Sequence, residues 1–279
     1  MSAFPPVHLV TYATSKYLHR QILLGLSGRL NRVVNTVTAW CPKKLLAAGF
    51  NEQVKDLELN ERGSGYWSWK PFIIQSRLNE VPEGDIVFYC DVGRRYPFTL
   101  LDQPITPFIE WMDSMGQEMI PGVENTWDGP VSHWTKREAL VFKGMDRQEI
   151  YDSTIIQAGF SFWRSGLKSR KIVSQWMDLC SRRNLISDDA SGCGLIELPE
   201  FREHRHDQSL LTLLCLQEGL KGLRFTESRP AFESGNPSEV SKYKFGSRKR
   251  PIAGTLLDLI LASPIQALEL KIRGRIKFS

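Results

Sequence analysis

The sequence predicts an α/β domain with a largely parallel or mixed sheet. Short runs of β-branched and aromatic residues alternate with longer segments of helical period, which is the pattern of strands separated by helices. The chain has 279 residues, 42% of them hydrophobic and 24% charged, so it holds enough apolar material for one large core. We therefore expect a globular protein and exclude a largely disordered one.

Four strands and five helices are expected. The predicted strands are Val7–Thr11, Val33–Ala39, Ile86–Tyr89 and Ile155–Phe162. The predicted helices are Lys16–Leu26, Trp69–Leu78, Thr106–Met115, Lys168–Cys180 and Asp207–Gln217. Two stretches, Gly116–Trp134 and Asn184–Glu203, are predicted to be irregular. Loops of that length in a compact domain are usually functional.

Charge, cysteines and hydropathy narrow the class of protein. A formal net charge of +5 suits phosphate-bearing ligands or an anionic membrane surface, but it is too small for a dedicated nucleic-acid binder. The five cysteines form no CxxC pair, which excludes a zinc knuckle and a disulfide framework. The amino terminus does not resemble a signal peptide. The most apolar stretch, Ile252 to Ile265, is shorter than the roughly 20 residues of a spanning helix. We expect a cytoplasmic protein.

The strongest functional signal is the segment Gly84 to Gly93, an apolar strand that delivers Asp91 at its carboxyl end. Open α/β sheets bind their ligands at that edge. The alternative is that Asp91 is a turn residue that caps the next element.

Three further motifs accompany this strand. Gly65-Tyr66-Trp67-Ser68-Trp69-Lys70-Pro71 precedes it, and Gln157-Ala158-Gly159-Phe160-Ser161-Phe162-Trp163 and His204-Arg205-His206-Asp207-Gln208-Ser209 follow it. In this order, over about Val7 to Leu220, the motifs resemble those of bacterial and viral GT-A glycosyltransferases. The resemblance implies a GT-A-like (Rossmann-like) mixed central sheet flanked by helices. Beyond Ser228 the sequence becomes polar and then basic, so we expect a GT-A-like catalytic domain, residues 1–228, and a basic, partly helical extension, residues 229–279.

The same resemblance implies a reaction. Such enzymes transfer a sugar, a hexosyl or pentosyl group, from a nucleotide-sugar donor such as a UDP-sugar to a glycan or glycolipid acceptor, as in polysaccharide biosynthesis. Their strand-end acidic motif, D-x-D, holds a divalent cation on the donor's two phosphates, so Asp91 would hold Mn²⁺ or Mg²⁺ beside Val92 and Gly93. The second acidic position of that motif is Gly93 here. Arg94 and Arg95 either bind phosphate in its place or are exposed loop residues.

The resemblance also assigns donor contacts. The loop after the first strand, Thr11-Tyr12-Ala13, would cradle the nucleotide. Lys70, at a helix start, would approach the diphosphate. Gln157, Ala158 and Gly159 would hold the donor sugar through a small-residue gap and an amide. For the last segment, a buried strand with a packing glycine is the alternative.

His206, Asp207 and Gln208 open a predicted helix, where Asp207 could be the N-cap. By resemblance to retaining families, Asp207 would stabilise an oxocarbenium-like centre and Gln208 would orient the sugar. In an inverting enzyme Asp207 would be the general base. His206 would assist the diphosphate or the metal; a metal pair of His204 and His206 lacks the further ligands that metallo-hydrolases place beside such a pair.

Two other functions and one surface remain open. A nucleotidyl- or phosphotransferase would need a glycine-rich phosphate loop, which this sequence lacks. A noncatalytic carbohydrate-binding protein would use the eight tryptophans. Residues 249–279 combine leucines with basic residues, and they either rest on an anionic membrane near a lipid-linked acceptor or pack on the domain or a second subunit.

Overall fold

The structure is a computed structural model that describes residues 4–92, 100 and 105–224. Its centre is a five-stranded mixed sheet with strand order β2-β1-β3-β7-β4. The strands are β1 (Val7–Tyr12), β2 (Val34–Trp40), β3 (Ile86–Cys90), β4 (Met119–Ile120) and β7 (Phe160–Arg164). β1 runs parallel to β2 and β3, and β7 runs antiparallel to β3 and β4. The predicted mixed α/β fold is confirmed.

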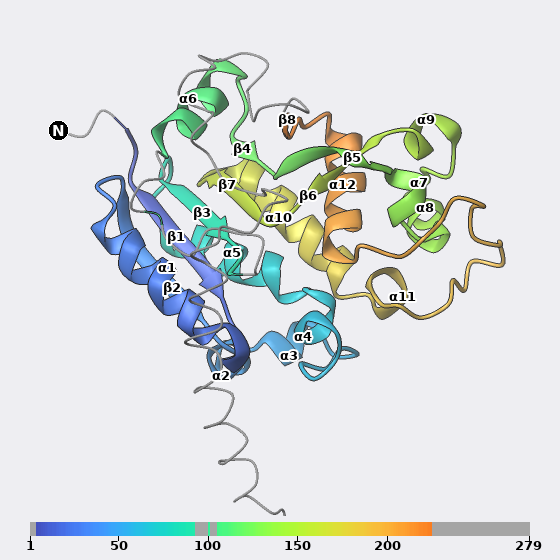
Figure 1. Cartoon of the computed structure of the whole chain (residues 1–279), viewed down its shortest axis with the longest axis horizontal. Coiled ribbons are helices and arrows are strands. Elements are labelled where there is room, and N and C mark those ends of the chain that lie inside the picture. Colours follow the sequence, from blue (N-terminus) through green and yellow to red (C-terminus); the bar gives the residue numbers. More distant parts are fainter. Residues whose placement is uncertain (1–3, 93–99, 101–104, 225–279) are drawn as a thin grey trace, which may run out of the picture.

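Two layers of helices cover the sheet (Figure 1). Side chains alternate along β3: Ile86 and Phe88 join a core with α1 (Leu18–Leu30) and α6 (Thr106–Ser114), whereas Val87 and Tyr89 join a core with α5 (Trp69–Glu80), α10 (Leu167–Cys180) and α12 (Asp207–Glu218). Because both faces of the strand are buried, it reads as a continuous apolar run. Residue 91 is two positions after Tyr89, so its side chain lies on the same face of the sheet, toward α5 and α12.

The five predicted helices are all present, with ends displaced by a few residues. The largest difference is at α1, which begins after a short 3-10 turn, η1 (Ser15–Tyr17), and continues to Leu30. α12 is apolar on several sides because Leu210, Leu211, Leu213 and Leu214 are all at most 1% exposed. It ends at a left-handed glycine, Gly219, with φ of 65°.

Two predictions about strands were wrong. Ile155–Phe162 is not one strand: β6 (Thr154–Gln157) and β7 are separated by a turn at Ala158 and Gly159 and belong to different sheets. Gly116–Trp134 is not irregular, because it contains β4, β5 (Val123–Pro130) and α7 (Val131–Trp134). β5 lies between β6 and β8 (Leu223–Arg224) in a second, three-stranded sheet.

The polar sequence of β5 concealed the strand. Glu124 is 7% exposed, and its carboxylate forms an ion pair with Arg224 on the neighbouring strand β8. Asn125 is 2% exposed, and its side-chain amide donates to Asp128 at 2.7 Å. A partner on the neighbouring strand for Glu124, and one within β5 for Asn125, thus compensate the desolvation that disfavours buried polar groups.

The other elements are short helices that connect the layers. They are α2 (Pro42–Ala47), α3 (Phe50–Gln53), α4 (Gly63–Tyr66), α8 (Arg137–Phe142), α9 (Gln148–Tyr151) and α11 (Arg183–Ile186). The predicted loop Asn184–Glu203 starts within α11 and has no helix or strand from Ser187 onward. In the described ranges no helix combines the length and hydrophobicity needed to span a bilayer. Gly93, Arg94, Arg95 and the predicted extension 229–279 lie outside the described residues.

Candidate functional site

Asp91 stands at the end of β3, on the side of the sheet that carries α5 and α12. Its backbone N–H donates to the carbonyl of Gly159 at 2.8 Å, which extends the pairing between β3 and β7 by one residue. Its carboxylate Oδ1 accepts a hydrogen bond from the hydroxyl of Tyr89, a fully buried residue. The dense surroundings raise the pKa of Asp91, against the opposing influence of Lys70 and of the Tyr89 hydrogen bond. Asp91 as a whole residue is half-buried.

A buried ion pair lies beside this carboxylate. Nζ of Lys70, in the first turn of α5, is 2.7 Å from Oδ2 of Asp207, the first residue of α12. The two side chains are only 4% and 6% exposed. The Lys70 ammonium also donates to the carbonyl of Ala158 at 3.1 Å. The ammonium is therefore held inside the protein by one ion pair and one hydrogen bond.

One ammonium serves two carboxylates in this site. The pKa of Asp207 is raised to about 6, mainly by burial; the charge of Asp91 adds to this shift, and the Lys70 ion pair opposes it. Burial lowers the pKa of Lys70, but Asp207 and Asp91 together outweigh that effect and the net shift is upward. With both acids ionised, two negative charges and one positive charge leave a formal net charge of −1. A cationic group is favoured at this position.

The segment before Lys70 forms a left-handed helical turn, which the sequence pattern does not predict. Five consecutive residues have positive φ: Gly63 (61°), Ser64 (59°), Gly65 (82°), Tyr66 (54°) and Trp67 (60°). Each non-glycine residue costs about 1–2 kcal/mol in this region. The indole N–H of Trp69 donates to the Gly63 carbonyl at 2.9 Å, so the first turn of α5 is tied to the left-handed turn. The turn thus fixes where α5 begins and where Lys70 lies.

His206 has strained backbone geometry directly before Asp207. Its φ of 50° and ψ of −122° match the first central position of a type II′ turn, which favours glycine, and Gln208 N–H closes the turn on the Arg205 carbonyl at 3.0 Å. The imidazole Nδ1 donates to the Ile186 carbonyl at 2.8 Å. Because a carbonyl only accepts, Nδ1 carries the proton in the neutral ring.

Aromatic rings connect this strained turn with the left-handed one. The His206 ring lies 5.1 Å from the ring of Tyr66 and stacks on Trp67 at 5.4 Å and 27°. Burial lowers the pKa of His206 from its ordinary value. The two strained segments therefore hold each other in place. One precedes α5 and the other precedes α12, and the first turns of these helices contain Lys70 and Asp207.

Several predicted site residues lie elsewhere than expected. Thr11 and Tyr12 belong to β1, so the predicted loop begins only at Ala13. Tyr12 is 5% exposed and stacks on Trp69 at 4.0 Å. Ala13 N–H donates to the carbonyl of Trp40 at 3.1 Å. The strand continues past Thr11 because its parallel pairing with β2 extends to Tyr12.

The other predicted residues differ in whether they contact the ion pair. Val92 is buried in the core on the α1 side and does not reach the ion pair. Gln157 ends β6, while Ala158 and Gly159 form the turn that contacts Lys70 and Asp91 through their carbonyls. Gln208 is half-buried in the first turn of α12. Their contacts with a donor sugar stay predictions.

The N-cap of α12 is His206 and not Asp207. No side chain caps this end, and the Asp207 carboxylate is directed to Lys70. The alternative in which Asp207 only caps its helix is therefore not what the geometry shows.

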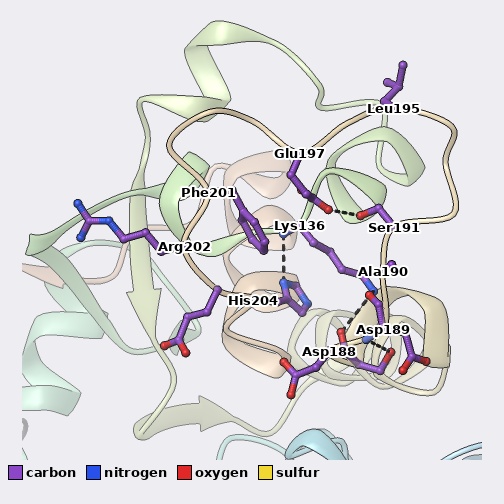
Figure 2. A pocket seen from close by; sticks show the side chains of 12 residues that line it. Lys136, Asp188, Asp189, Ala190, Ser191, Leu195, Glu197, Phe201, Arg202 and His204 are labelled. Carbon is purple, nitrogen blue, oxygen red and sulfur yellow. Dashed lines mark hydrogen bonds between the residues drawn. The ribbon is translucent and has the colours of Figure 1, made fainter.

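A cavity of about 480 Å³ is lined by residues up to His204, two positions before His206 (Figure 2). Most of its lining comes from the irregular segment after α11, and Lys136, at the start of α8, completes it. His204 accepts from the backbone N–H of Lys136 at 3.2 Å, and its ring lies 5.4 Å from that of His206. Asp188, also in the lining, places a carboxylate oxygen 3.6 Å from Nε2 of His206.

The residues that lie around Asp91 fit a cation that is held mainly by its substrate. In the described part of the chain, no three or more His, Cys, Asp and Glu side chains gather as a metal site. Mg²⁺, however, is often bound by one or two carboxylates together with substrate phosphates. Asp91 offers such an oxygen, since Tyr89 engages only Oδ1 and no hydrogen bond from a described residue reaches Oδ2. His204 accepts a hydrogen bond on Nδ1, so its neutral ring carries the proton on Nε2, whereas the neutral His206 ring carries it on Nδ1.

Comparison with known proteins adds little to this geometry. No protein-family model matches the chain, and no curated protein is significantly similar to it. Among solved structures, the chain is similar to mouse xyloside xylosyltransferase 1 in its apo form, with a TM-score of 0.41 and 11% identity, over 78% of this chain and 85% of that one. A likeness at this level assigns neither family nor function, which must be inferred from the chain's own residues.

Proposed function

We propose that this chain is a glycosyltransferase of the GT-A type, which moves a sugar from a nucleoside-diphosphate donor to a hydroxyl of a glycan or lipid-linked acceptor. One observation supports it above all: Lys70 joins the two acidic motifs, because its ammonium pairs with Asp207 and lowers the pKa of Asp91. Acidic groups gathered at the carboxyl edge of a sheet are suited to binding a sugar diphosphate and its counter-charges.

The reaction forms a bond between the acceptor oxygen and the anomeric carbon. The bond from that carbon to the diphosphate oxygen breaks, and its electron pair leaves with the diphosphate. If the enzyme inverts, Asp207 takes the acceptor proton as general base; if it retains, the proton passes to the departing diphosphate and Asp207 stabilises positive charge at the anomeric carbon. Lys70 acts as a positioning residue, which holds the Asp207 carboxylate in place and favours its ionised form.

We assign a divalent cation, Mn²⁺ or Mg²⁺, to Asp91. When bound there, the cation would neutralise charge on the leaving diphosphate. The net charge of −1 on Asp91, Lys70 and Asp207 supports this assignment, because a buried excess charge is unfavourable without compensation. Tyr89 contributes by orienting the carboxylate through its hydroxyl.

The cavity in Figure 2 is our candidate for part of the acceptor site. Carboxylates such as Asp188 and Glu203 can accept hydrogen bonds from sugar hydroxyls, and the Phe201 ring offers an apolar face to a pyranose. Two of its lining residues, His204 and Asp188, contact His206, the neighbour of Asp207 in the chain. On this assignment Phe201→Ala raises the KM for acceptor and leaves the KM for donor unchanged.

A donor screen tests the function. Nucleotide sugars are tested one by one, with and without manganese, by thermal shift and by release of nucleoside diphosphate, on the full chain and on Asp91→Asn and Asp207→Asn. We expect one nucleoside diphosphate to stabilise the protein and both variants to lose turnover. If the chain binds glycans and Asp91→Asn changes nothing, it is a carbohydrate-binding protein; if it releases pyrophosphate or transfers a nucleotide or phosphate, it belongs to the competing transferase class.

A further inference from the structure

Four large apolar side chains form a stripe on the outside of α1. Leu18, Ile22, Leu26 and Leu30 are 41%, 50%, 50% and 71% exposed. They follow each other at intervals of four residues, which places them on one side of the helix. The opposite side of α1, including Leu24 and Gly28, packs on the sheet. We call these four residues the α1 stripe.

The regular spacing of these four side chains distinguishes the α1 stripe from apolar residues scattered singly over a surface. Single exposed apolar residues are common on proteins, but a contiguous row usually marks a binding surface. Figure 1 shows α1 along the outer side of the central sheet, beside the edge strand β2. Within the described part of the chain, no helix or strand packs over this row.

The charged residues along the chain before and after the stripe have one sign. Residues 1–51 contain six Lys and Arg residues and no Asp or Glu. Lys16 lies just before the helix, Arg29 is in its last turn and Arg32 follows it, and all three are exposed. None of the three forms an ion pair with another described residue. An apolar row bordered by unpaired cations is complementary to anionic headgroups above acyl chains.

We propose that the α1 stripe docks on an anionic lipid bilayer, with the leucines in the headgroup–acyl boundary and the basic residues on lipid phosphates. η1 and the start of α1 follow directly after the carboxyl end of β1, the edge of the sheet at which Asp91 also lies. Docking through α1 therefore keeps that edge close to the membrane surface. The inference stands on α1 alone and does not need the proposed transferase activity.

Vesicle sedimentation of the full chain tests the docking. Vesicles of equal parts phosphatidylglycerol and phosphatidylcholine are compared with vesicles of phosphatidylcholine alone. We expect binding to the mixed vesicles that weakens with added salt. Leu26→Gln/Leu30→Gln should lower the partition coefficient roughly tenfold, because exposed leucines lose apolar burial in the bilayer and glutamine keeps the helix propensity. The matched control is Leu167→Gln on α10, a residue that is 84% exposed outside the stripe.

Two charge variants test whether the basic residues bind lipid phosphates. Lys16→Gln and Arg29→Gln should each lower binding to the mixed vesicles about fivefold, while Lys168→Gln, exposed on α10, should not. Unchanged binding in the leucine and charge variants overturns the proposal. If Leu26→Gln/Leu30→Gln instead lowers the melting temperature or dissociates an oligomer without affecting vesicle binding, the stripe is covered by the carboxy-terminal segment or by a second copy, and the proposal is also wrong.

Discussion

Nζ of Lys70 lies 2.7 Å from Oδ2 of Asp207, so the first turn of α5 and the first turn of α12 meet through one buried ion pair. Breaking a buried pair by removing one partner typically costs 3–5 kcal/mol, because the remaining charge has no compensation. The pair therefore links folding of the two helix starts to the chemistry proposed for them.

Removal of the lysine should affect both stability and pH dependence. Lys70→Met leaves Asp207 and Asp91 without their cation, so we expect a loss of about 3–5 kcal/mol in the free energy of unfolding and a higher pKa for Asp207. The unfolding free energy is measured at pH 8 and pH 5. A variant as stable as the parent at pH 8 would contradict the assignment, since both acids are ionised there.

The double variant is the matched control. Lys70→Met/Asp207→Asn removes the cation and its partner together, and it should recover part of the stability that Lys70→Met loses at pH 8. The coupling between the two single changes in a double-mutant cycle then reports the ion pair itself. No measurable coupling would show that the two groups do not interact.

Ionisation of Asp207 should set the acid limit of activity. Its pKa is about 6 in the folded protein, against an ordinary value of 3.8. Whether the carboxylate acts as base or as charge stabiliser, turnover should fall as pH drops below about 6. The measurement is kcat against pH with saturating donor. An acid limb near pH 4 would mean that Asp207 is not the titrating group.

The same shift predicts the sign of a stability change with pH. Because the folded pKa lies above the unfolded one, the folded state holds the Asp207 proton more tightly, and stability decreases as pH rises from about 4 to 6. Asp207→Asn should remove this contribution. Comparing the melting temperatures of parent and variant across that window tests it, and parallel curves would contradict it.

The left-handed turn can be tested with two glycines of nearly equal φ. Gly63 (φ 61°) and Gly116 (φ 60°) both take an alanine at the backbone cost of about 1–2 kcal/mol. A Cβ at Gly63 would lie 2.5 Å from the Trp67 ring, whereas a Cβ at Gly116 meets nothing within 4 Å. We expect Gly63→Ala to be the more destabilising by about 1–3 kcal/mol and to reduce turnover, and Gly116→Ala to leave turnover unchanged. Equal effects would mean that Trp67 is not held by the turn.

Two substitutions at His206 separate its backbone from its ring. His206→Gly relieves the strain of φ 50° but loses the contacts with Ile186, Tyr66 and Trp67; His206→Ala loses the same contacts and keeps the strain. We expect His206→Ala to be less stable than His206→Gly by about 1–2 kcal/mol, with turnover reduced in both. Chemical denaturation measures the difference. Equal stability of the two variants would remove the argument for strain.

The main strands and helices can be predicted from the sequence because the patterns that indicate them are local. The apolar run before Asp91 and the helical period after Trp69 each follow from side chains within one element, and both agree with the structure. The resemblance assigns Asp91 and Asp207 to one site. In the structure Asp207 pairs with Lys70, and the charge of Asp91 contributes to raising the pKa of Lys70.

What the sequence did not predict depends on distant contacts. Positive φ at Ser64 and Trp67 is unfavourable locally and persists only because Trp69 and His206 hold the segment. The two glycines of Gly63-Ser64-Gly65 were the sequence feature that could have indicated a turn with positive φ. The break between β6 and β7 was hidden for a similar reason, since a continuous apolar run does not reveal that its two halves enter different sheets.

The most direct test of the central claim is turnover of a nucleotide sugar by Asp91→Asn and Asp207→Asn, beside Asp178→Asn as an exposed control on α10. Folding of each variant is checked by its melting temperature. We predict that the two site variants lose at least about a hundredfold in kcat, the usual scale for an acid–base or charge-stabilising group, while Asp178→Asn keeps parental activity. Parental turnover in a folded Asp91→Asn or Asp207→Asn protein would contradict the proposed site.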